Sequence, residues 1–364
     1  MSTPPDAIEA VSQRVDTFFS SEQAATADWG PEAAGFVAAA RASVHGGKRL
    51  RARFCLTGWQ AVAEAHGPAA APPAAVIAAA ASLEVFHAAA LVHDDLIDNS
   101  DTRRGRPAAH RALQTAHTHA GWTGDAAAFG RSASVLLGDL LVAWSDDLFE
   151  SGLVEAETAV AAVARAEYAR MRRDVTIGQY LDIAEESAFG SSPDAEHADR
   201  ALRVASLKSA RYSVEQPLLI GAALAGADAV QRAALSGFGH PIGMAFQLRD
   251  DVLGVFGDEA VTGKPSGDDL REGKRTVLIA FARQAVPAGV RRTLDELIGD
   301  PTLEAEQIRS LQQTIIDSGA LARVEDLITA YAREADRALA GSPLGTHAVG
   351  RLRDLALAAT ERQA

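Results

Sequence analysis

"VIAAAASLEVFHAAALVHDDLID" occupies residues 76–98 and decides the fold. The segment is apolar nearly all round, as in a helix that other helices enclose. Aspartates interrupt it at its end, where Asp94 and Asp98 share one helix face and Asp95 lies beside them. Carboxylates so placed repel one another and oppose the helix dipole. Solvation at an exposed helix end or a bridging divalent cation would relieve the repulsion, and this motif alone leaves both possibilities open.

The composition narrows the class of protein. The 364-residue chain carries a net charge of −13, which disfavours a nucleic-acid binder. Its single cysteine, Cys55, excludes an intrachain disulfide and is expected in the core. The N-terminus lacks a signal-peptide pattern, and we expect no apolar segment of the roughly 20 residues that would cross a bilayer. The sequence therefore predicts a soluble, cytoplasmic protein with no membrane span.

Apolar residues recur at helical spacing along the chain, without convincing alternation of period two. The pattern predicts an all-α protein, a single large helical bundle. Helices are expected at 6–20, 31–44, 48–65, 73–97, 125–149, 155–186, 198–225, 228–256, 269–286, 303–317, 320–339 and 343–361. Segments rich in Pro, Gly, Ser and Asp should end helices at 65–75, 105–108 and 187–199.

A second acidic pair, Asp250 and Asp251, lies near the end of another apolar helix, from Ile242 to Val255. Helices that face one another in a bundle core can hold metal ions between such side chains. Mg²⁺ keeps part of its water shell and is held by one or two carboxylates together with substrate phosphates. The two clusters therefore predict a Mg²⁺ site and an anionic substrate.

Basic residues provide the complement to an anionic substrate. "GGKRLR" (46–51) places Lys48, Arg49 and Arg51 at a predicted helix start, where backbone N–H groups and the helix dipole also favour an anion. "TRRGRPAAHR" (102–111) follows the first acidic cluster and offers further guanidinium groups. Other lysines, each alone typical of a solvated surface, accompany these groups: Lys208, Lys264 and Lys274. Together they predict a site for two anions, one held through metal and one directly.

Several short motifs occur along the chain in an order and at a spacing that are typical of a known family. They are "GGKRLR" (46–51), "HAAALVHDDLID" (87–98) with "TRRG" (102–105), "GQYLDI" (178–183), "KSARYS" (208–213), "FQLRDDVLG" (246–254), "GKPSGDDL" (263–270) and "EGKRT" (272–276). In this order and spacing the chain resembles the trans-type polyprenyl diphosphate synthases, such as farnesyl and geranylgeranyl diphosphate synthases. The resemblance implies the all-α isoprenoid synthase type I fold around a deep central cavity, usually as a homodimer. It also implies a partly helical N-terminal segment at 1–30 and a catalytic domain at 31–364.

The resemblance also implies an activity and residue roles. The reaction is the Mg²⁺-dependent head-to-tail condensation of isopentenyl diphosphate with an allylic diphosphate (dimethylallyl, geranyl or farnesyl). Asp94, Asp95 and Asp98 match the first aspartate-rich motif, Asp250 and Asp251 match the second, and the metal ligands are Asp94, Asp98 and Asp250. The positions that bind isopentenyl diphosphate are matched by Lys48, Arg51, His87 and Arg104. Those around the allylic diphosphate are matched by Arg103, Lys208, Ser209, Gln247, Lys264 and Lys274, with Lys208 also counted as catalytic.

The chain departs from the family pattern in two places. Gly254 stands where the second motif often has a third aspartate, and Ser209 stands where threonine is usual. The hydroxyl survives at 209, and both clusters keep their first aspartate, so we expect activity. Gln179 and Asp182 match the family's "GQxxD" motif, whereas Tyr180 is expected to pack in the core and His93 to be structural.

Product length depends on what lines the cavity before Asp94. One and two turns earlier lie Ala90, Ala89 and then Phe86, and bulky side chains at the alanines would close the cavity early. One helical turn rises about 5.4 Å, comparable to one isoprene unit. The small residues favour geranylgeranyl over farnesyl diphosphate as the product, and a farnesyl or a longer-chain polyprenyl diphosphate synthase stays an alternative.

Two other classes remain as alternatives. A terpene cyclase also ionises allylic diphosphates, but it needs no second diphosphate site and typically carries an Asn/Ser/Glu metal motif where this chain has "QLRDD" (247–251). A non-catalytic synthase subunit tends to lose an aspartate cluster, and this chain keeps both.

Overall fold

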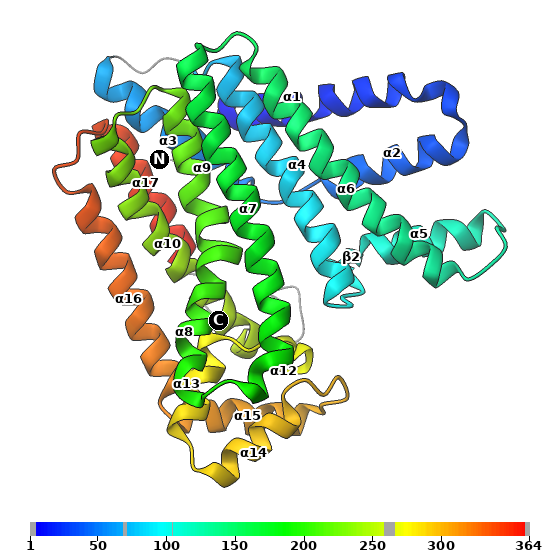
Figure 1. The fold of residues 1–364 in the computed structure, drawn as a ribbon, viewed down its shortest axis with the longest axis vertical. Helices are drawn as coiled ribbons and strands as arrows, with labels where there is room; N and C mark the ends of the chain where they lie inside the picture. Colours follow the sequence, from blue (N-terminus) through cyan, green and yellow to red (C-terminus); the bar gives the residue numbers. More distant parts are fainter. Residues whose placement is uncertain (1–4, 68–70, 104, 258–265, 361–364) are drawn as a thin grey trace. The chain divides into compact units, whose positions relative to one another are not determined.

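The computed structural model describes residues 5–67, 71–103, 105–257 and 266–360. Apart from one two-stranded β hairpin, the regular structure of these residues is helical (Figure 1). The chain divides into two compact units. The N-terminal unit comprises residues up to Val163 and the short stretch Ile220–Gly226, and the C-terminal unit comprises Ala164–Leu219 and residues from Ala227 onward. The division falls inside two helices, α7 (Thr158–Ala188) and α9 (Gln216–Leu224).

In the N-terminal unit, the apolar helix α4 (Ala74–Ile97) packs along α6 (Ala126–Leu153), and the two lie side by side in Figure 1. The N-cap of α6 is Asp125, whose carboxylate accepts hydrogen bonds from the amides of Ala127 and Ala128. The remaining elements of this unit are α1 (Pro5–Ala25), η1 (Ala27–Trp29), α2 (Pro31–Ser43), α3 (Leu50–His66), β1 (Thr102–Arg103), β2 (Arg106–Pro107) and α5 (Ala109–His119).

The N-terminal helix α1 is part of the core of this unit. Phe18 and Phe19 each meet Trp144 of α6 edge to face, with ring centroids 6.1 and 5.5 Å apart. Arg14 also donates a hydrogen bond to Ser151 of α6 at 2.8 Å. The α1 residues Arg14, Phe18 and Phe19 therefore pack against α6. A catalytic domain that begins at residue 31 stays a prediction.

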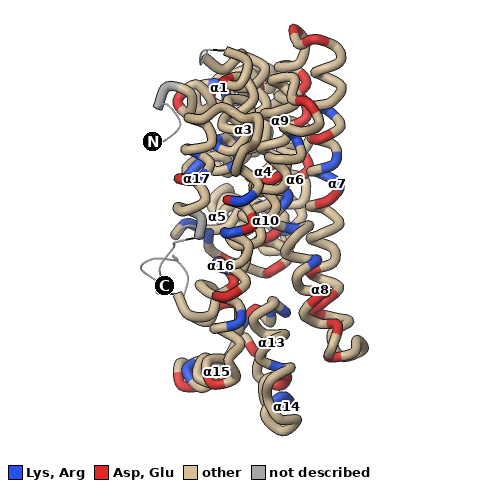
Figure 2. The backbone as a smooth tube through the Cα atoms, turned by 90° about the vertical axis from the view of Figure 1, so that its left-hand side faces the viewer, with Lys and Arg blue, Asp and Glu red and all other residues tan. Residues whose placement is uncertain are grey.

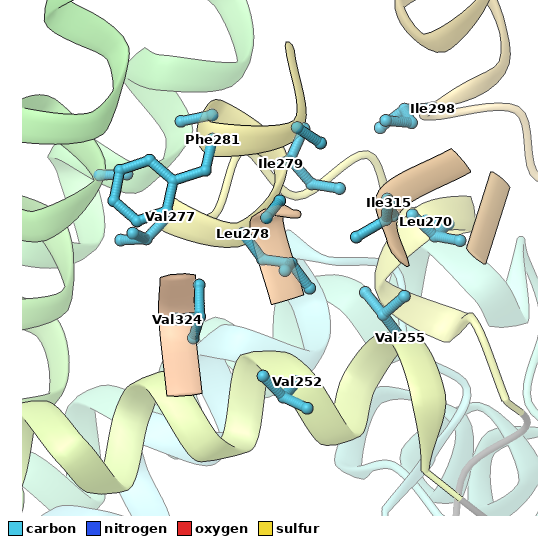
Figure 3. Packing of buried hydrophobic residues seen from close by; sticks show 14 of the residues in the cluster. Val252, Val255, Leu270, Val277, Leu278, Ile279, Phe281, Ile298, Ile315 and Val324 are labelled. Carbon is cyan, nitrogen blue, oxygen red and sulfur yellow. The ribbon is translucent and has the colours of Figure 1, made fainter. Parts of the chain in front are cut away.

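In the C-terminal unit, α10 (Ala229–Phe256) packs against α16 (Ala320–Leu339). Figure 3 shows Val252 and Val255 of α10 among apolar side chains of the helices that follow. Burial of this face of α10 fixes the helix that carries the second acidic pair. The remaining elements are η2 (Phe189–Ser191), η3 (Asp194–Glu196), α8 (His197–Val204), the π-helical η4 (Ala205–Glu215), α12 (Asp268–Glu272), α13 (Val277–Ala285), α14 (Ala288–Leu297), α15 (Ala305–Asp317) and α17 (Thr346–Thr360).

Most predicted helices are confirmed, and three details were wrong. The helices α5 and α14 were not predicted. The stretch predicted as one helix at 269–286 is two helices, because Gly273 ends α12 with φ of +79°. The stretch predicted at 198–225 contains the π-helical turns of η4, which a period of 3.6 residues does not anticipate.

The expectation about membrane-spanning length was also wrong. Within the described part of the chain, α4 and α6 are each long and apolar enough to cross a bilayer. In α4, 72% of the most apolar window is buried inside the protein, as in a core helix, whereas in α6 only 28% is buried. By contrast, charged residues recur along α7 and α8 in Figure 2.

Candidate active site

The first acidic motif lies at the C-terminal end of α4. The Asp98 amide donates to the Asp94 carbonyl at 2.8 Å, so Asp98 is the C-cap of the helix. Asp95 is buried at 3% exposure, whereas Asp94 and Asp98 are partly exposed. The side chains predicted to bind metal are thus the accessible members of this cluster.

Arg103 of β1 neutralises the cluster from inside the protein. Its Nε donates to Asp95 Oδ1 at 2.8 Å, and its Nη2 lies 3.5 Å from Asp94 Oδ2. Burial lowers the pKa of Arg103, but the hydrogen bond to Asp95 and the nearby carboxylates outweigh it and hold the pKa above its usual value. The β hairpin, in which Arg103 pairs with Arg106, therefore presents a fixed cation to the aspartates.

The basic motif "GGKRLR" lies where α3 begins. Lys48 is exposed and Arg51 is half-buried. The amide of Ala52 donates to Glu84 Oε1 of α4 at 3.0 Å, so this N–H of the first turn is not available to an anion, contrary to the prediction. Glu84 also lies 3.6 Å from Arg49 Nη1. Sequence reasoning missed Glu84, although one carboxylate in an apolar helix is a signal for a buried partner.

The second acidic motif lies near the C-terminal end of α10 and repeats the division of the first. Asp251 is buried at 7% exposure and accepts a hydrogen bond from Gln247 Nε2 at 2.7 Å, whereas Asp250 is exposed. Burial, and then the charge of Asp269, raise the pKa of Asp251 well above its usual range. Asp250, the predicted metal ligand, is again the accessible carboxylate.

Asp269 of α12 is a second acidic residue that sequence reasoning missed. A Cβ atom at Gly254 would lie 2.0 Å from Asp269 Oδ2, so the Asp269 carboxylate lies where a side chain at 254 would begin. Lys274 Nζ lies 3.7 Å from Asp269 Oδ1 and 2.6 Å from Glu272 Oε2. The structure thus brings the Asp269 carboxylate, with Lys274 beside it, next to Gly254.

Lys208 lies in η4 and contacts α7. Its Nζ is 2.5 Å from Asp182 Oδ2, which joins the "KSARYS" motif to the "GQYLDI" motif. A Cβ atom at Gly178 would lie only 2.4 Å from the Lys208 amide nitrogen, so glycine is needed for η4 to approach α7 this closely. Ser209 is partly buried.

Tyr180 was expected in the core, but its exposure is 67%. On α7 it points away from Gly178 and Asp182, which lie two residues on either side and face η4. Cys55 is buried, as predicted, and burial raises the pKa of its thiol to about 12.

The remaining predicted residues are placed as follows. Phe86 and Ala89 are buried, Ala90 and His87 are partly exposed, and His93 lies 3.5 Å from Asp139 Oδ1 of α6. Arg104 and Lys264 lie outside the described residues.

The donors suit Mg²⁺, since both clusters offer accessible carboxylate oxygens beside a buried carboxylate that a protein group already binds. Among the residues the structure describes, no group of three or more His, Cys, Asp or Glu side chains is close enough to hold an ion. Such carboxylates bind Mg²⁺ together with phosphate oxygens of a ligand. This all-α chain with aspartate-rich helix ends has the type I isoprenoid synthase fold, which it shares with solved geranylgeranyl pyrophosphate synthases.

Comparison with known proteins gives the family. The polyprenyl synthetase family matches residues 35–315, and the chain belongs to this family. The geranylfarnesyl diphosphate synthase of Aeropyrum pernix is 33% identical over 310 residues, covering 83% of this chain and 87% of its own. The geranylgeranyl diphosphate synthase of Mycobacterium tuberculosis is 36% identical over 202 residues, covering 56% and 51%.

Among solved structures, a geranylgeranyl pyrophosphate synthase from Corynebacterium glutamicum, complexed with isoprenyl diphosphate and magnesium, superposes with a TM-score of 0.90. It is 37% identical, and the match covers 98% of both chains. The chain is therefore a prenyltransferase, a polyprenyl diphosphate synthase that carries out short-chain prenyl diphosphate condensation.

Proposed function

We propose that this synthase condenses isopentenyl diphosphate with allylic diphosphates to form geranylgeranyl diphosphate. One observation carries the residue roles: in each acidic cluster a buried aspartate has a protein donor, and an accessible aspartate lies beside it. Asp95 is held by Arg103 and Asp251 by Gln247. In this proposal the buried aspartates hold the clusters in place and the accessible aspartates meet the ligand.

In this proposal the ligands of Mg²⁺ are Asp94, Asp98 and Asp250. When bound by these carboxylates, Mg²⁺ would neutralise charge on the diphosphate leaving group of the allylic substrate. Asp95 and Asp251 position their neighbours rather than bind metal directly. Substitution of either buried aspartate would remove the acceptor of a buried hydrogen bond, which costs more than the bond contributes.

In this proposal, cationic and hydrogen-bonding side chains bind the allylic diphosphate. Negative charge develops on this group as its bond to carbon breaks, so fixed cations stabilise the transition state more than the ground state. Arg103 and Lys208 are already oriented by carboxylates, which lowers the cost of reorganisation. The proposed set is Arg103, Lys208, Ser209, Gln247, Lys264 and Lys274.

The second substrate, isopentenyl diphosphate, is bound directly by cations and one histidine, namely Lys48, Arg51, His87 and Arg104. Its double bond attacks the allylic carbon, and a proton is then lost, with the departing pyrophosphate as the base. No protein nucleophile takes part. Apolar walls exclude the water that would quench the allylic cation.

The product length follows from the residues before Asp94. Ala90 and Ala89, about one turn before Asp94, are small, and Phe86, about two turns before it, is bulky. A floor at Phe86 lies roughly one helical turn, about 5.4 Å, beyond a floor at position 89. The relatives' names include both geranylgeranyl and geranylfarnesyl diphosphate synthases, so product length varies among similar chains.

The test is the product made by the purified chain. With labelled isopentenyl diphosphate, Mg²⁺ and each allylic primer in turn, we expect a twenty-carbon product. A main product of fifteen carbons, or one much longer than twenty, would contradict the assignment. Asp94→Ala and Asp250→Ala should each abolish condensation, whereas an active double variant would contradict the metal-ligand roles.

We also infer a soluble cytoplasmic homodimer. Val135 and Leu136 of α6 are 44% and 62% exposed, an apolar surface that a second copy would cover. Leu136→Asp should convert a dimer to a monomer in sedimentation experiments. A wild-type chain that sediments as a monomer would contradict the proposal.

A further inference from the structure

Glu84 is a buried charge in the middle of the apolar helix α4. It is 7% exposed, and its neighbours from Ala78 to Phe86 are buried apolar or small residues. A carboxylate in such a place is costly unless it is paired and hydrogen-bonded. Glu84 has two partners, the Ala52 amide at 3.0 Å and the Arg49 guanidinium at 3.6 Å, and both belong to the start of α3.

The start of α3 lacks a cap of its own. Arg49 stands at the N-cap position, has no side-chain acceptor, and makes no capping hydrogen bond, and the first turn contains no acidic residue. The first amides of a helix need acceptors, and negative charge there is favourable. Glu84 of α4 supplies both the acceptor and the negative charge, so its carboxylate caps the N-terminus of α3.

The backbone that leads into α3 needs this support. Gly46 and Gly47 have φ of +85° and +86°, and Arg49, which is not a glycine, has φ of +50°. A non-glycine residue in the left-handed region costs on the order of 1 kcal/mol, and it persists where the surroundings fix it. Arg49 is fixed by its pairing with Glu84, since its side chain is only 14% exposed. The Lys48 carbonyl also accepts a hydrogen bond from Arg53 Nε at 3.0 Å.

We propose that Glu84 is a positioning residue for isopentenyl diphosphate: by capping α3 and fixing Arg49 in its left-handed conformation, it sets the directions of Lys48 and Arg51. Arg49 neutralises Glu84, so that the buried carboxylate does not repel the diphosphate. The motif "GGKRLR" thus divides its cations into an inner one, Arg49, that holds the loop and outer ones, Lys48 and Arg51, that bind substrate. This inference rests on the proposed roles of Lys48 and Arg51.

The test compares two variants of Glu84. Glu84→Ala removes the cap and leaves the Arg49 guanidinium without its carboxylate, whereas Glu84→Gln keeps an oxygen that can accept from the Ala52 amide. We expect Glu84→Ala to raise KM for isopentenyl diphosphate ~10-fold or more, with a smaller rise for Glu84→Gln. KM for the allylic substrate should change less than twofold, which separates positioning from general loss of structure. Isothermal titration of each variant with isopentenyl diphosphate should show the same order of affinities.

A double-mutant cycle with Lys48 tests whether Glu84 affects KM for isopentenyl diphosphate by orienting Lys48. If Glu84 acts by orienting Lys48, then Glu84→Ala in a Lys48→Ala background should raise KM for isopentenyl diphosphate much less than it does in the wild type. An equal rise in both backgrounds would overturn the positioning role. If Glu84→Ala does not fold, Glu84→Gln takes its place in the cycle.

Glu185 of α7 provides a matched control. It is also 7% exposed and pairs with one guanidinium, Arg200, at 2.6 Å. Glu185→Gln should lower stability without changing KM for isopentenyl diphosphate. If KM for isopentenyl diphosphate is unchanged in the Glu84 variants but raised in Lys48→Ala and Arg51→Ala, the positioning role of Glu84 is overturned and the proposed substrate site is not. Unchanged KM in Lys48→Ala and Arg51→Ala would instead contradict the proposed substrate site.

Discussion

The ammonium of Lys208 lies 2.5 Å from the Asp182 carboxylate, a contact that joins the π-helical segment η4 to α7. Both side chains are about one-quarter exposed, so water screens the pair only in part. The carboxylate orients a cation that we assign to the allylic diphosphate. Asp182 should therefore affect catalysis without touching substrate.

The first prediction concerns this pair. Asp182→Asn should raise KM for the allylic diphosphate by roughly 5- to 10-fold, because a neutral amide holds the ammonium less firmly than a carboxylate. Steady-state kinetics with both substrates varied would measure it, and KM for isopentenyl diphosphate should not change. Glu325→Gln, which breaks the ion pair with Arg249 in the same unit, is the control. If Asp182→Asn and Glu325→Gln raise KM for the allylic diphosphate equally, Asp182 has no specific role in orienting Lys208.

The second prediction concerns Gly254. Gly254→Asp introduces the third aspartate that the family resemblance implies for the second motif, yet its Cβ would meet the Asp269 carboxylate at 2.0 Å and its side chain would add a further negative charge. We expect a loss of about 1–3 kcal/mol in the free energy of unfolding, measured without Mg²⁺ by urea denaturation. Gly289→Asp adds the same charge in α14, where a Cβ meets nothing within 4 Å. A Gly254→Asp variant as stable as Gly289→Asp would show that Asp269 moves freely.

The third prediction concerns product length. Ala89→Phe should shorten the main product by one isoprene unit, because it places a bulky side chain nearer to Asp94 than the proposed floor at Phe86. Ala89 is fully buried, so the variant should also lose about 1–3 kcal/mol of stability from overpacking. Ala79→Phe, at another fully buried alanine of α4 about 15 Å earlier, separates the two effects. Ala79→Phe should lose stability and keep the wild-type product. An unchanged product from Ala89→Phe would contradict the proposal that this part of α4 limits the length of the growing chain.

The fourth prediction concerns pH. Burial, followed by the charge of Glu215, raises the pKa of Glu167 in α7, although Arg170 opposes this shift. A raised carboxyl pKa in the folded state contributes stability below the pKa of the unfolded chain, and this is lost as pH rises through the folded pKa. At neutral pH the ionised Glu167 therefore costs stability. Glu167→Gln should raise the midpoint of thermal unfolding at pH 7, and the gain should vanish near pH 4. A gain that grows on acidification would contradict the shift.

The residues of the site were more predictable than their contacts. Carboxylate pairs at the ends of apolar helices can be recognised in the sequence, because adjacent negative charges beside an apolar segment are unfavourable unless solvent or a cation compensates them. The partners were not predictable, since Glu84 with Ala52 and Lys208 with Asp182 are pairs far apart in the sequence. Asp269 was missed because only the structure shows its carboxylate occupying the space at Gly254.

The fold was predictable where periodicity is strong. The helices α4, α6 and α10 are long and apolar, and their predicted spans are close to those observed. The helix α5 was missed because its sequence, "AHRALQTAHTH", is rich in polar residues and follows a Gly-Pro-containing stop. The helix α14 was missed because it is short and directly follows Pro287, so the sequence of this stretch is typical of a loop.

The π-helical geometry of η4 constrains which insertions and deletions the chain tolerates. A π turn contains roughly one residue more than an α turn, so removing one residue between Ala205 and Glu215 would let a π turn close as an α turn while the flanking helices α8 and α9 keep their register. Side chains within the segment would rotate by up to about 100°, the rotation of one residue in an α-helix. Lys208 would then point away from Asp182 of α7, and the chain would keep its helices but lose the orientation of this ammonium group.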